Sequence, residues 1–357
     1  MTTNSDSYRR AGQSLEGSPK KWLVTGVAGF IGSNLLEALL ELGQFVVGMD
    51  NFVTGYRHNL EDVERTVGPE KWAKFEFIEG DIRNPEDCRR ACSEVDYVLH
   101  QAALGSVPRS IDDPIATNSC NVDGFLQTLL AAKEERVKRF VFASSSSVYG
   151  DSPKLPKVEN EIGSPLSPYA ASKLANEIYA QAFSNVYDFN WIGLRYFNVF
   201  GKRQDPKGAY AAVIPRWIDA LIRLKTPIIN GDGETSRDFC YIGDVIQGNI
   251  LAALAGRPEA VNRVYNIACG DRTTLNQLFR IIGESLSSHV PGTDRISPEY
   301  GPFRAGDVRH SLADVSMAGE LLGYEPSYSV ATGMEEYIEW YVRSTVPGVE
   351  DLSDACP

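Results

Sequence analysis

A glycine-rich turn ahead of an amphipathic stretch constrains the fold of this chain most. The turn, Thr25–Gly32, has the sequence Thr-Gly-Val-Ala-Gly-Phe-Ile-Gly, follows an apolar run and opens an expected helix at Ile31–Leu42. Gly26, Gly29 and Gly32 permit a tight turn, a close main-chain approach to a pyrophosphate, and close packing of helix on strand. The helix N-terminus adds free amides and a partial positive charge. This context predicts a dinucleotide-binding fold.

Short apolar runs alternate with amphipathic stretches over the first two-thirds of the chain. We expect strands at Trp22–Thr25, Phe45–Asp50, Phe75–Ile78, Tyr97–His100, Arg139–Ala143 and Trp191–Tyr196. We expect helices at Ile31–Leu42, Pro85–Glu94, about Pro114–Glu135 and Pro168–Tyr187. The alternation is typical of a parallel sheet with helices on both faces. The predicted fold class is α/β, a Rossmann-type doubly wound parallel sheet with a smaller α/β C-terminal substrate lobe.

The pattern becomes less regular after Gly201, and we expect one return to the sheet, around Arg237–Leu254. The polar start, Met1–Lys20, is expected to be a loose tail or a short docking arm. The expected domains are an N-terminal tail (1–20), a dinucleotide-binding domain (21–200 with about 238–268), a substrate lobe (201–237 with about 269–346) and a C-terminal tail (347–357).

Composition excludes several classes of partner. The 357 residues carry a formal net charge of −12, which argues against nucleic acid and against anionic membranes. No apolar run approaches the length of a membrane span, and the N-terminus lacks a signal-peptide core, so we expect a cytoplasmic protein. No bound metal is expected, because no metal-like grouping joins the histidines to the cysteines, which are Cys88, Cys92, Cys120, Cys240, Cys269 and Cys356.

An aspartate ends the second expected strand. Asp50 stands where a carboxylate accepts hydrogen bonds from the adenosine ribose hydroxyls, and it would repel a 2′-phosphate. Because Asn51 rather than an arginine follows, we predict NAD rather than NADP as the cofactor. Asp81 and Ile82, after the third strand, are candidates to frame the adenine.

A tyrosine and a lysine four residues apart supply the candidate chemistry. Tyr169 and Lys173 lie in the run Ser167–Lys173, in which Pro168 stands where a helix would begin. At that spacing both side chains lie on one helix face. An ammonium beside a phenol favours the phenolate, and lowering the tyrosine pKa from about 10 to about 7 needs roughly 4 kcal/mol. We expect Lys173 and an oxidised nicotinamide ring together to supply this stabilisation of the phenolate.

With these features the chain resembles the extended short-chain dehydrogenase/reductases. Further motifs make it similar to nucleotide-sugar C4-epimerases of the UDP-galactose/UDP-glucose 4-epimerase type. Leu104–Ser110 is closest to the bacterial branch that acts on UDP-N-acetylhexosamines, and the resemblance covers roughly residues 20–345. The further motifs are His100–Ala103, Asn121–Gly124, Ala143–Gly150, Arg195–Gly201, Gly233–Phe239 and Arg304–Arg309.

The resemblance implies roles position by position. Ser145 would bond the sugar C4 oxygen and complete a triad with Tyr169 and Lys173, and Asn121 would help hold a water and the lysine geometry. Positions matching the family's cofactor-binding residues are Gly26, Gly29, Phe30, Ile31, Gly32, Asp50, Asn51, Asp81, Ile82, Gln101, Ala102, Ala103, Asn121, Tyr169, Lys173, Tyr196 and Val199. Positions matching its substrate-binding residues are Ser106, Arg109, Ser145, Ser146, Ser147, Tyr169, Asn198, Gln204, Tyr210, Ala212, Val213, Asn230, Arg237, Arg304, Asp307 and Ser311.

The implied reaction is reversible C4 epimerisation of a UDP-sugar through a 4-keto intermediate, with tightly bound NAD. The related 4,6-dehydratases need an Asp-Glu pair where this chain has Ser146 and Ser147, and the decarboxylases carry a Glu there. A simple NAD-linked reductase needs only the tyrosine and lysine and stays an alternative. A non-catalytic NAD-binding scaffold is a further alternative, although such proteins often lose the tyrosine or lysine.

Two finer expectations also rest on the resemblance. Ser311 stands four residues after Gly306-Asp307, at the family position that caps the pocket over the sugar 2-substituent. A small residue there leaves space for an N-acetyl group, so UDP-GlcNAc and UDP-GalNAc are the expected substrates, with plain and uronic UDP-sugars as further candidates. A homodimer packed through helices near residues 114–135 and 168–187 is expected.

Overall fold

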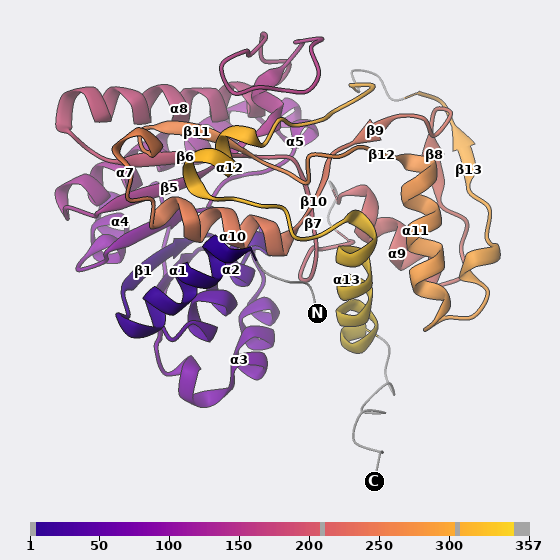
Figure 1. The fold of residues 1–357 in the computed structure, drawn as a ribbon, viewed down its shortest axis with the longest axis horizontal. Helices are drawn as coiled ribbons and strands as arrows, with labels where there is room; N and C mark the ends of the chain where they lie inside the picture. The colour runs from indigo at the N-terminus through magenta and orange to yellow at the C-terminus, as the bar shows by residue number, and fades with distance from the viewer. Residues whose placement is uncertain (1–4, 208–210, 304–307, 346–357) are drawn as a thin grey trace.

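Seven parallel strands form one sheet in the computed structural model, which describes residues 5–207, 211–303 and 308–345. Across the sheet, the order is β11 (Arg263–Ile267), β6 (Trp191–Tyr196), β5 (Arg139–Ser145), β4 (Tyr97–His100), β1 (Lys21–Thr25), β2 (Phe45–Asp50) and β3 (Phe75–Glu79). Every neighbouring pair is parallel. The carboxyl ends of all seven strands therefore meet at one edge, as predicted for a doubly wound sheet (Figure 1).

Helices cover both faces of the sheet. One face carries α2 (Phe30–Glu41), α3 (Arg57–Trp72) and α10 (Ile242–Ala253), and the other carries α4 (Pro85–Cys92), α7 (Gly124–Glu134) and α8 (Pro168–Tyr187). Strand β1 shows why both faces are apolar: Trp22 and Val24 pack into one core, and Leu23 packs into the other. Because side chains alternate along a strand, a strand buried on both faces reads as a continuous apolar run.

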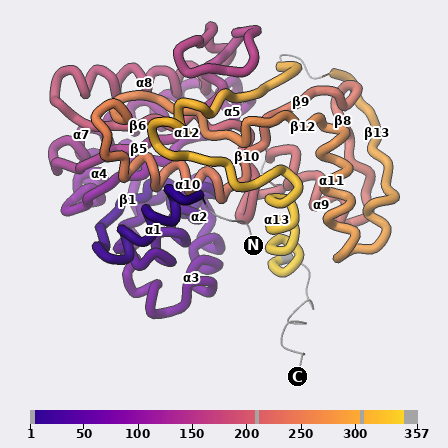
Figure 2. Tube along the Cα trace, viewed as in Figure 1, coloured from indigo at the N-terminus to yellow at the C-terminus, as the bar shows by residue number. Residues whose placement is uncertain are grey.

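The N-terminal segment is docked on the rest of the protein, which agrees with the expected docking arm and not with the loose tail given as its alternative. Residues 6–17 form helix α1 (Asp6–Gly17), and the hydroxyl of its N-cap, Ser5, donates to Oε1 of Gln247 on α10 at 3.2 Å. Leu15 is buried, and its carbonyl accepts a bond from Gln44 at 3.1 Å. Figure 2 shows this first helix, in indigo, beside the much later α10. The helix escaped prediction because its sequence is mostly polar and buries only a narrow face.

The long helical stretch expected at residues 114–135 contains a break in its hydrogen-bond pattern. It consists of α6 (Pro114–Asn118), a π-helical turn at Ser119–Asp123, and α7. A further short helix, α5 (Val107–Asp112), precedes it and was not predicted. Single π turns inside α-helices are rare and occur often at functional sites.

Some of the elements beyond residue 197 form a second, smaller group at the right of Figure 1, which includes the segments 213–222, 228–230, 275–287 and 299–301. We expected the chain to return to the main sheet around Arg237–Leu254, but that segment forms β10 and α10. The return is made later, by β11. The division into the stated domains stays a prediction. The elements are β7 (Asn198–Phe200), α9 (Val213–Ile222), β8 (Ile228–Asn230), β9 (Ser236–Arg237), β10 (Phe239–Tyr241), β12 (Thr273–Thr274), α11 (Leu275–Ser287), β13 (Glu299–Gly301), α12 (Ser316–Leu322) and α13 (Val330–Thr345), with 3-10 turns at Ser146–Tyr149, Pro258–Ala260 and Thr293–Arg295.

Within the described ranges, the helices are all too short or too polar to cross a membrane.

A histidine is buried among aromatic rings at the end of β4. The His100 ring stacks on Phe140 at 5.6 Å between ring centroids and meets the edge of Phe125 at 5.6 Å. Its Nδ1 lies 3.0 Å from the hydroxyl of Thr25. Burial, helped by the nearby Lys173 ammonium, lowers the pKa of His100 to about 3. The native protein therefore holds this imidazole neutral, because the charged form would lose its hydration.

This burial predicts acid sensitivity. An unfolded histidine titrates near pH 6.5, so His100 contributes full stability above that pH, and the contribution is lost as pH falls toward 3. The unfolding free energy of the wild type should fall as the pH drops from 6 to 4.5. We expect His100→Gln to make this slope shallower, by about 1.4 kcal/mol per pH unit at most. Urea unfolding followed by circular dichroism measures the slope. The exposed His58, changed to Gln, is the control, and equal slopes for wild type and His100→Gln would contradict the account.

Candidate active site

The glycine-rich turn folds as predicted at the carboxyl end of β1. Gly26 has φ +68°, and a Cβ there would lie 2.9 Å from the main chain of Ala102. A Cβ on Gly32 would lie 2.1 Å from the carbonyl oxygen of Gly26, so only glycine lets the first turn of α2 rest on the loop. Gly29 is the N-cap of α2 and supplies no side chain, which leaves the helix N-terminus open to a ligand.

Asp50 lies at the carboxyl end of β2, beside this turn. Its carboxylate accepts bonds from the main-chain N–H groups of Ala28 at 2.9 Å and Phe52 at 2.8 Å. Burial raises the pKa of Asp50, while these main-chain donors act against the rise. Asn51 turns away from it and donates to Asp81 at 3.0 Å. The carboxylate is thus fixed at the wall of the cavity described next, with lone pairs left for further donors.

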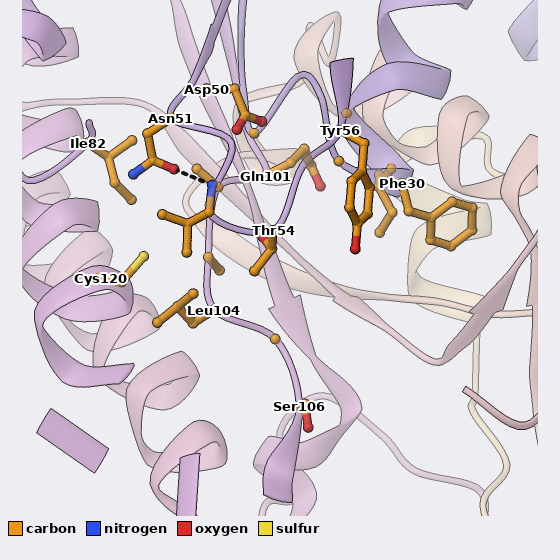
Figure 3. Close-up of a pocket in the computed structure, with 18 of the residues that line it drawn as sticks. Phe30, Asp50, Asn51, Thr54, Tyr56, Ile82, Gln101, Leu104, Ser106 and Cys120 are labelled. Carbon is orange, nitrogen blue, oxygen red and sulfur yellow. Dashed lines mark hydrogen bonds between the residues drawn. The ribbon is translucent and has the colours of Figure 1, made fainter. Parts of the chain in front are cut away.

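A cavity of about 650 Å³ lies over the carboxyl edge of the sheet. In Figure 3, Ile82 and Cys120 lie on one side of it, and Phe30 and Tyr56 lie on the other. The predicted residues that line it are Gly26, Gly29, Phe30, Ile31, Gly32, Asp50, Asn51, Ile82, Gln101, Ala102 and Ala103 from the cofactor set, and Ser106, Arg109, Gln204 and Ala212 from the substrate set. A glycine turn, an open helix N-terminus and a carboxylate in one cavity fit a dinucleotide.

Sequence reasoning missed part of this wall. The Tyr56 hydroxyl, from the loop after β2, donates to Oδ2 of Asp205 at 2.7 Å, and this bond raises the pKa of Tyr56. Both residues line the cavity, so the bond joins two loops that are far apart in sequence. The Gly55 that precedes Tyr56 was a usable sign of a turn, but nothing in the sequence pairs Tyr56 with Asp205. The other missed lining residues are Met49, Val53, Thr54, Gly80, Arg83, Leu104, Gly105, Ala116, Cys120 and Ala211.

Some predicted cofactor residues lie behind the cavity wall. Asp81 makes a two-pronged ion pair with Arg83, and the hydrogen bond from Arg83 lowers the pKa of Asp81 to about 2. Tyr196 is buried, and its hydroxyl lies 3.2 Å from Oε1 of Gln101, so it acts on the cavity through Gln101. Val199 lies on β7, where its carbonyl accepts a bond from Gln204.

Asn121 bonds the helix that carries the lysine, and its expected part in holding a water and the lysine geometry stays a prediction. Its side chain lies in the π-helical turn, accepts from the main-chain N–H of Leu104 at 2.7 Å, and donates to the Leu104 carbonyl at 3.1 Å. It also donates to the hydroxyl of Ser172 on α8 at 3.1 Å. Asn121 therefore ties the loop after β4 to the helix that carries Tyr169 and Lys173, rather than bonding Lys173 itself.

Tyr169 and Lys173 lie on one face of α8, as predicted. Ser167 caps the helix by accepting from the main-chain N–H of Ala170 at 3.1 Å, and Pro168 follows at the first helical position. The Lys173 ammonium lies 5.9 Å from the centroid of the Tyr169 ring. It is held by the carbonyl of Ala143 on β5, at 2.8 Å. The four-residue spacing therefore places the phenol and the ammonium side by side at the carboxyl edge of the sheet.

Burial dominates the electrostatics of this pair in the protein alone. Burial raises the pKa of Tyr169, and only the hydrogen bond with Ser145 acts to lower it. Burial also lowers the pKa of Lys173 to about 8. Removing both groups from water disfavours both charged forms, so the expectation that Lys173 and an oxidised nicotinamide ring together lower the pKa of Tyr169 stays a prediction.

The serine run after β5 turns back beside Tyr169. Ser145 accepts from the main-chain N–H of Ser147 at 3.1 Å and so begins the 3-10 turn Ser146–Tyr149. The Ser147 hydroxyl is buried with no hydrogen-bond partner among the described residues, and the same is true of Oε1 of the cavity-lining Gln204. Such orphaned groups are typical of positions that a ligand satisfies.

The remaining substrate candidates lie on the smaller group of elements. Nη1 of Arg237 donates to the carbonyl of Ser236 at 3.0 Å, and the main-chain N–H of Ser311 donates to the same carbonyl at 3.1 Å. Arg237 and Ser311 are thus brought together on one carbonyl, while their roles in binding the substrate stay predictions. Asn198 and Asn230 are exposed on β7 and β8, and Val213 begins α9. Tyr210, Arg304 and Asp307 lie outside the described residues.

Comparison with known proteins gives a consistent result. The chain is 36% identical over 322 residues to UDP-glucose 4-epimerase of Mycolicibacterium smegmatis, covering 89% of this chain and 97% of that protein. It resembles the structure of UDP-N-acetylglucosamine 4-epimerase from Methanobrevibacter ruminantium in complex with UDP-N-acetylmuramic acid, with TM-score 0.82, 37% identity, and coverage of 91% and 99%. It also resembles UDP-glucuronic acid 4-epimerase from Bacillus cereus in complex with UDP-glucuronic acid and NAD, with TM-score 0.79, 31% identity, and coverage of 91% and 99%.

The family model described as "NAD dependent epimerase/dehydratase family" matches residues 22–268. This range holds the glycine turn, the cavity wall and the Tyr169–Lys173 helix. The chain therefore belongs to the NAD dependent epimerase/dehydratase family.

Proposed function

We propose that this protein is an NAD-dependent UDP-sugar 4-epimerase that interconverts UDP-N-acetylglucosamine and UDP-N-acetylgalactosamine. One observation carries the proposal: the Tyr169 hydroxyl lies beside Ser145, with the Lys173 ammonium 5.9 Å from the Tyr169 ring, at the sheet edge that also carries the dinucleotide cavity. A hydroxyl that moves a proton beside a hydride acceptor is what alcohol oxidation and its reversal require.

Each side chain has a defined task in this reaction. Bound NAD supplies the acceptor, and afterwards the donor, of the hydride at the sugar C4. Tyr169 takes the proton of the C4 hydroxyl as that carbon is oxidised, and it returns the proton once the 4-keto sugar has turned over. Ser145 bonds the same oxygen and shares the proton. The glycine turn and Asp50 hold the cofactor, while Arg237 helps anchor the UDP portion.

The raised pKa of Tyr169 sets a condition on the mechanism. In the protein alone the phenol stays protonated at neutral pH, because burial disfavours the phenolate. The positive charge of oxidised nicotinamide, together with the Lys173 ammonium, would have to lower that pKa. Ionisation of Tyr169 is therefore expected to follow cofactor binding, so that the base is formed only in the loaded enzyme.

The N-acetyl preference rests on a narrower argument. The three relatives above are epimerases of UDP-glucose, UDP-N-acetylglucosamine and UDP-glucuronic acid, which supports 4-epimerisation without choosing a sugar. Ser311 is small, half-buried and held next to Arg237 through Ser236. A small side chain at this family position leaves space for a 2-acetamido group.

Other activities of the fold fit less well. Neighbouring structures include a dTDP-glucose 4,6-dehydratase from Streptomyces venezuelae at 30% identity. The family's dehydratases use an acidic pair where this chain has Ser146 and Ser147, whose hydroxyls are poor general acids and bases. A 4-reductase or a non-catalytic NAD-binding scaffold is separated from an epimerase by the assay given below.

A second copy of this chain is the proposed partner. Ile115 on α6 is 79% exposed, and Ile178 and Val186 on α8 are 62% and 71% exposed. These helices are neighbours on one side of the sheet. Apolar side chains gathered on neighbouring helices favour an interface between copies, and the resemblance implies a homodimer at this place.

The first prediction concerns the chemistry. The purified wild-type protein, incubated with UDP-GlcNAc and no added cofactor, should give a mixture with UDP-GalNAc and no net NADH. Tyr169→Phe should lower kcat by about 10²-fold or more, because proton transfer is lost, while bound NAD is retained. Tyr179→Phe, on the exposed side of the same helix, is the matched control. Near-normal kcat for Tyr169→Phe would remove Tyr169 from the chemistry, and net NADH would indicate a reductase.

The second prediction concerns substrate size. Ser311→Tyr should abolish turnover of UDP-GlcNAc while sparing UDP-Glc, since the larger ring fills the space of the acetamido group. Measuring kcat/KM for both sugars with the same enzyme preparation provides an internal control for folding and cofactor content. Equal losses on both substrates would contradict the assignment of Ser311.

The third prediction concerns assembly. Ile178→Glu places a charge in the proposed interface and should convert a dimer into a monomer, as measured by light scattering after size-exclusion chromatography. Thr66→Glu, at an exposed position of α3 on the opposite face of the sheet, should leave the dimer intact. A monomeric wild type would refute the proposed interface.

A further inference from the structure

The stripe of α8 that carries the tyrosine and lysine extends by one more turn. Tyr169, Lys173 and Glu177 are spaced four residues apart, so they lie along one side of the helix. Lys173 already reaches the last part of β5, through its bond to the Ala143 carbonyl. Glu177 is buried, although no step of the proposed reaction uses it.

Glu177 contacts the serine that precedes Ser145. Its Oε1 accepts a bond from the hydroxyl of Ser144 at 2.5 Å, and Ser144 is also buried. Because Ser144 and Ser145 are consecutive on β5, this contact fixes where Ser145 lies relative to α8. Tyr169, two turns earlier on the same stripe, bonds the Ser145 side chain. Helix α8 is therefore bonded to consecutive residues of β5, with Lys173 on Ala143 and Glu177 on Ser144.

An arginine on the neighbouring strand completes the lock. Arg195 on β6 pairs with Ser144 in the strand register, and its Nε and Nη2 donate to the two carboxylate oxygens of Glu177 at 2.9 and 2.7 Å. The side chains of Arg195 and Glu177 are only 3% and 8% exposed. Burial alone would lower the pKa of Arg195, but the bonds and charge of Glu177 raise it.

The same guanidinium also reaches the end of the serine turn. Its Nη1 donates to the carbonyl of Glu159 at 2.8 Å, and its central carbon lies 4.9 Å from the centroid of the Tyr149 ring. Tyr149 is the last residue of the 3-10 turn that Ser145 begins. One buried cation thus contacts Glu177 on the helix and Tyr149 at the end of the serine turn, while Glu177 in turn accepts from Ser144, just before the turn begins.

We propose that Glu177 and Arg195 are positioning residues for the proposed epimerisation: through Ser144 they set the register between α8 and β5 that aims Tyr169 at Ser145. This inference rests on the proposed function. Neither residue touches the reacting atoms, so their effect passes through Ser144 and the serine turn. Small displacements of reacting groups have large effects on rate, which is why such a lock matters.

Two variants test the lock in different ways. Ser144→Ala removes the contact between β5 and Glu177 but leaves the forked Arg195–Glu177 pair in place, so the fold is kept. Glu177→Gln keeps the side-chain shape but leaves the Arg195 charge buried and uncompensated, so it also loses stability. If Glu177→Gln does not fold, Ser144→Ala decides the question by itself.

The measurement is a steady-state rate, divided by the concentration of folded enzyme that contains NAD. We expect kcat for the UDP-sugar to fall by about tenfold in Ser144→Ala and by about 10²-fold in Glu177→Gln, with KM changed less than about twofold. The acidic limb of the pH profile of kcat, along which activity rises as Tyr169 ionises, should move to higher pH, because a misaligned Ser145 lowers the phenol pKa less. A merely structural role would lower stability and leave kcat, KM and the pH profile unchanged.

A carboxylate at the amino ends of the strands, away from the candidate site, is the matched control. Asp96 bonds the Lys138 ammonium at 2.6 Å and the main-chain N–H of Lys21 at 3.0 Å. Asp96→Asn should cost stability without changing kcat. A wild type that epimerises no UDP-sugar overturns the proposed function. An active wild type whose kcat is unaffected by Ser144→Ala and Glu177→Gln overturns the inference alone.

Discussion

The bond between the Lys173 ammonium and the Ala143 carbonyl is the contact on which the site depends. A buried ammonium is stable only when it is hydrogen-bonded, so this bond fixes α8 against the carboxyl end of β5. Burial lowers the pKa of Lys173 to about 8 and raises that of Tyr169. At neutral pH the pair is therefore an ammonium beside a protonated phenol, and an added positive charge nearby would shift the phenol toward the phenolate.

The parallel sheet brings the two halves of the site together. The glycine turn follows β1 and the serine run follows β5, and both emerge at the same edge because every strand runs in the same direction. Asn121, in the π-helical turn, links the loop after β4 to α8 and so couples the cavity wall to the Tyr169 helix. The cavity wall and the helix of the proposed proton-transferring tyrosine are thus hydrogen-bonded to each other.

The sequence was informative where a local rule determines the geometry. Gly32 has to be glycine because a Cβ would overlap the Gly26 carbonyl, and the Tyr169–Lys173 spacing places both groups on one helix face. It was uninformative where distant segments meet. Neither the Tyr56–Asp205 bond nor the packing of α1 follows from local pattern. The direction of the Tyr169 pKa also depends on burial, which the spacing of charges does not reveal.

The central claim is that hydrogen leaves the sugar C4 and returns to the same carbon within one binding event. The most direct test is to incubate the enzyme with UDP-GlcNAc that carries deuterium at C4. The UDP-GalNAc product is then analysed by mass spectrometry and NMR. The account predicts that the deuterium stays at C4 in the product, because the hydride never exchanges with water. Loss of the label to solvent would contradict the account and indicate proton abstraction from carbon instead.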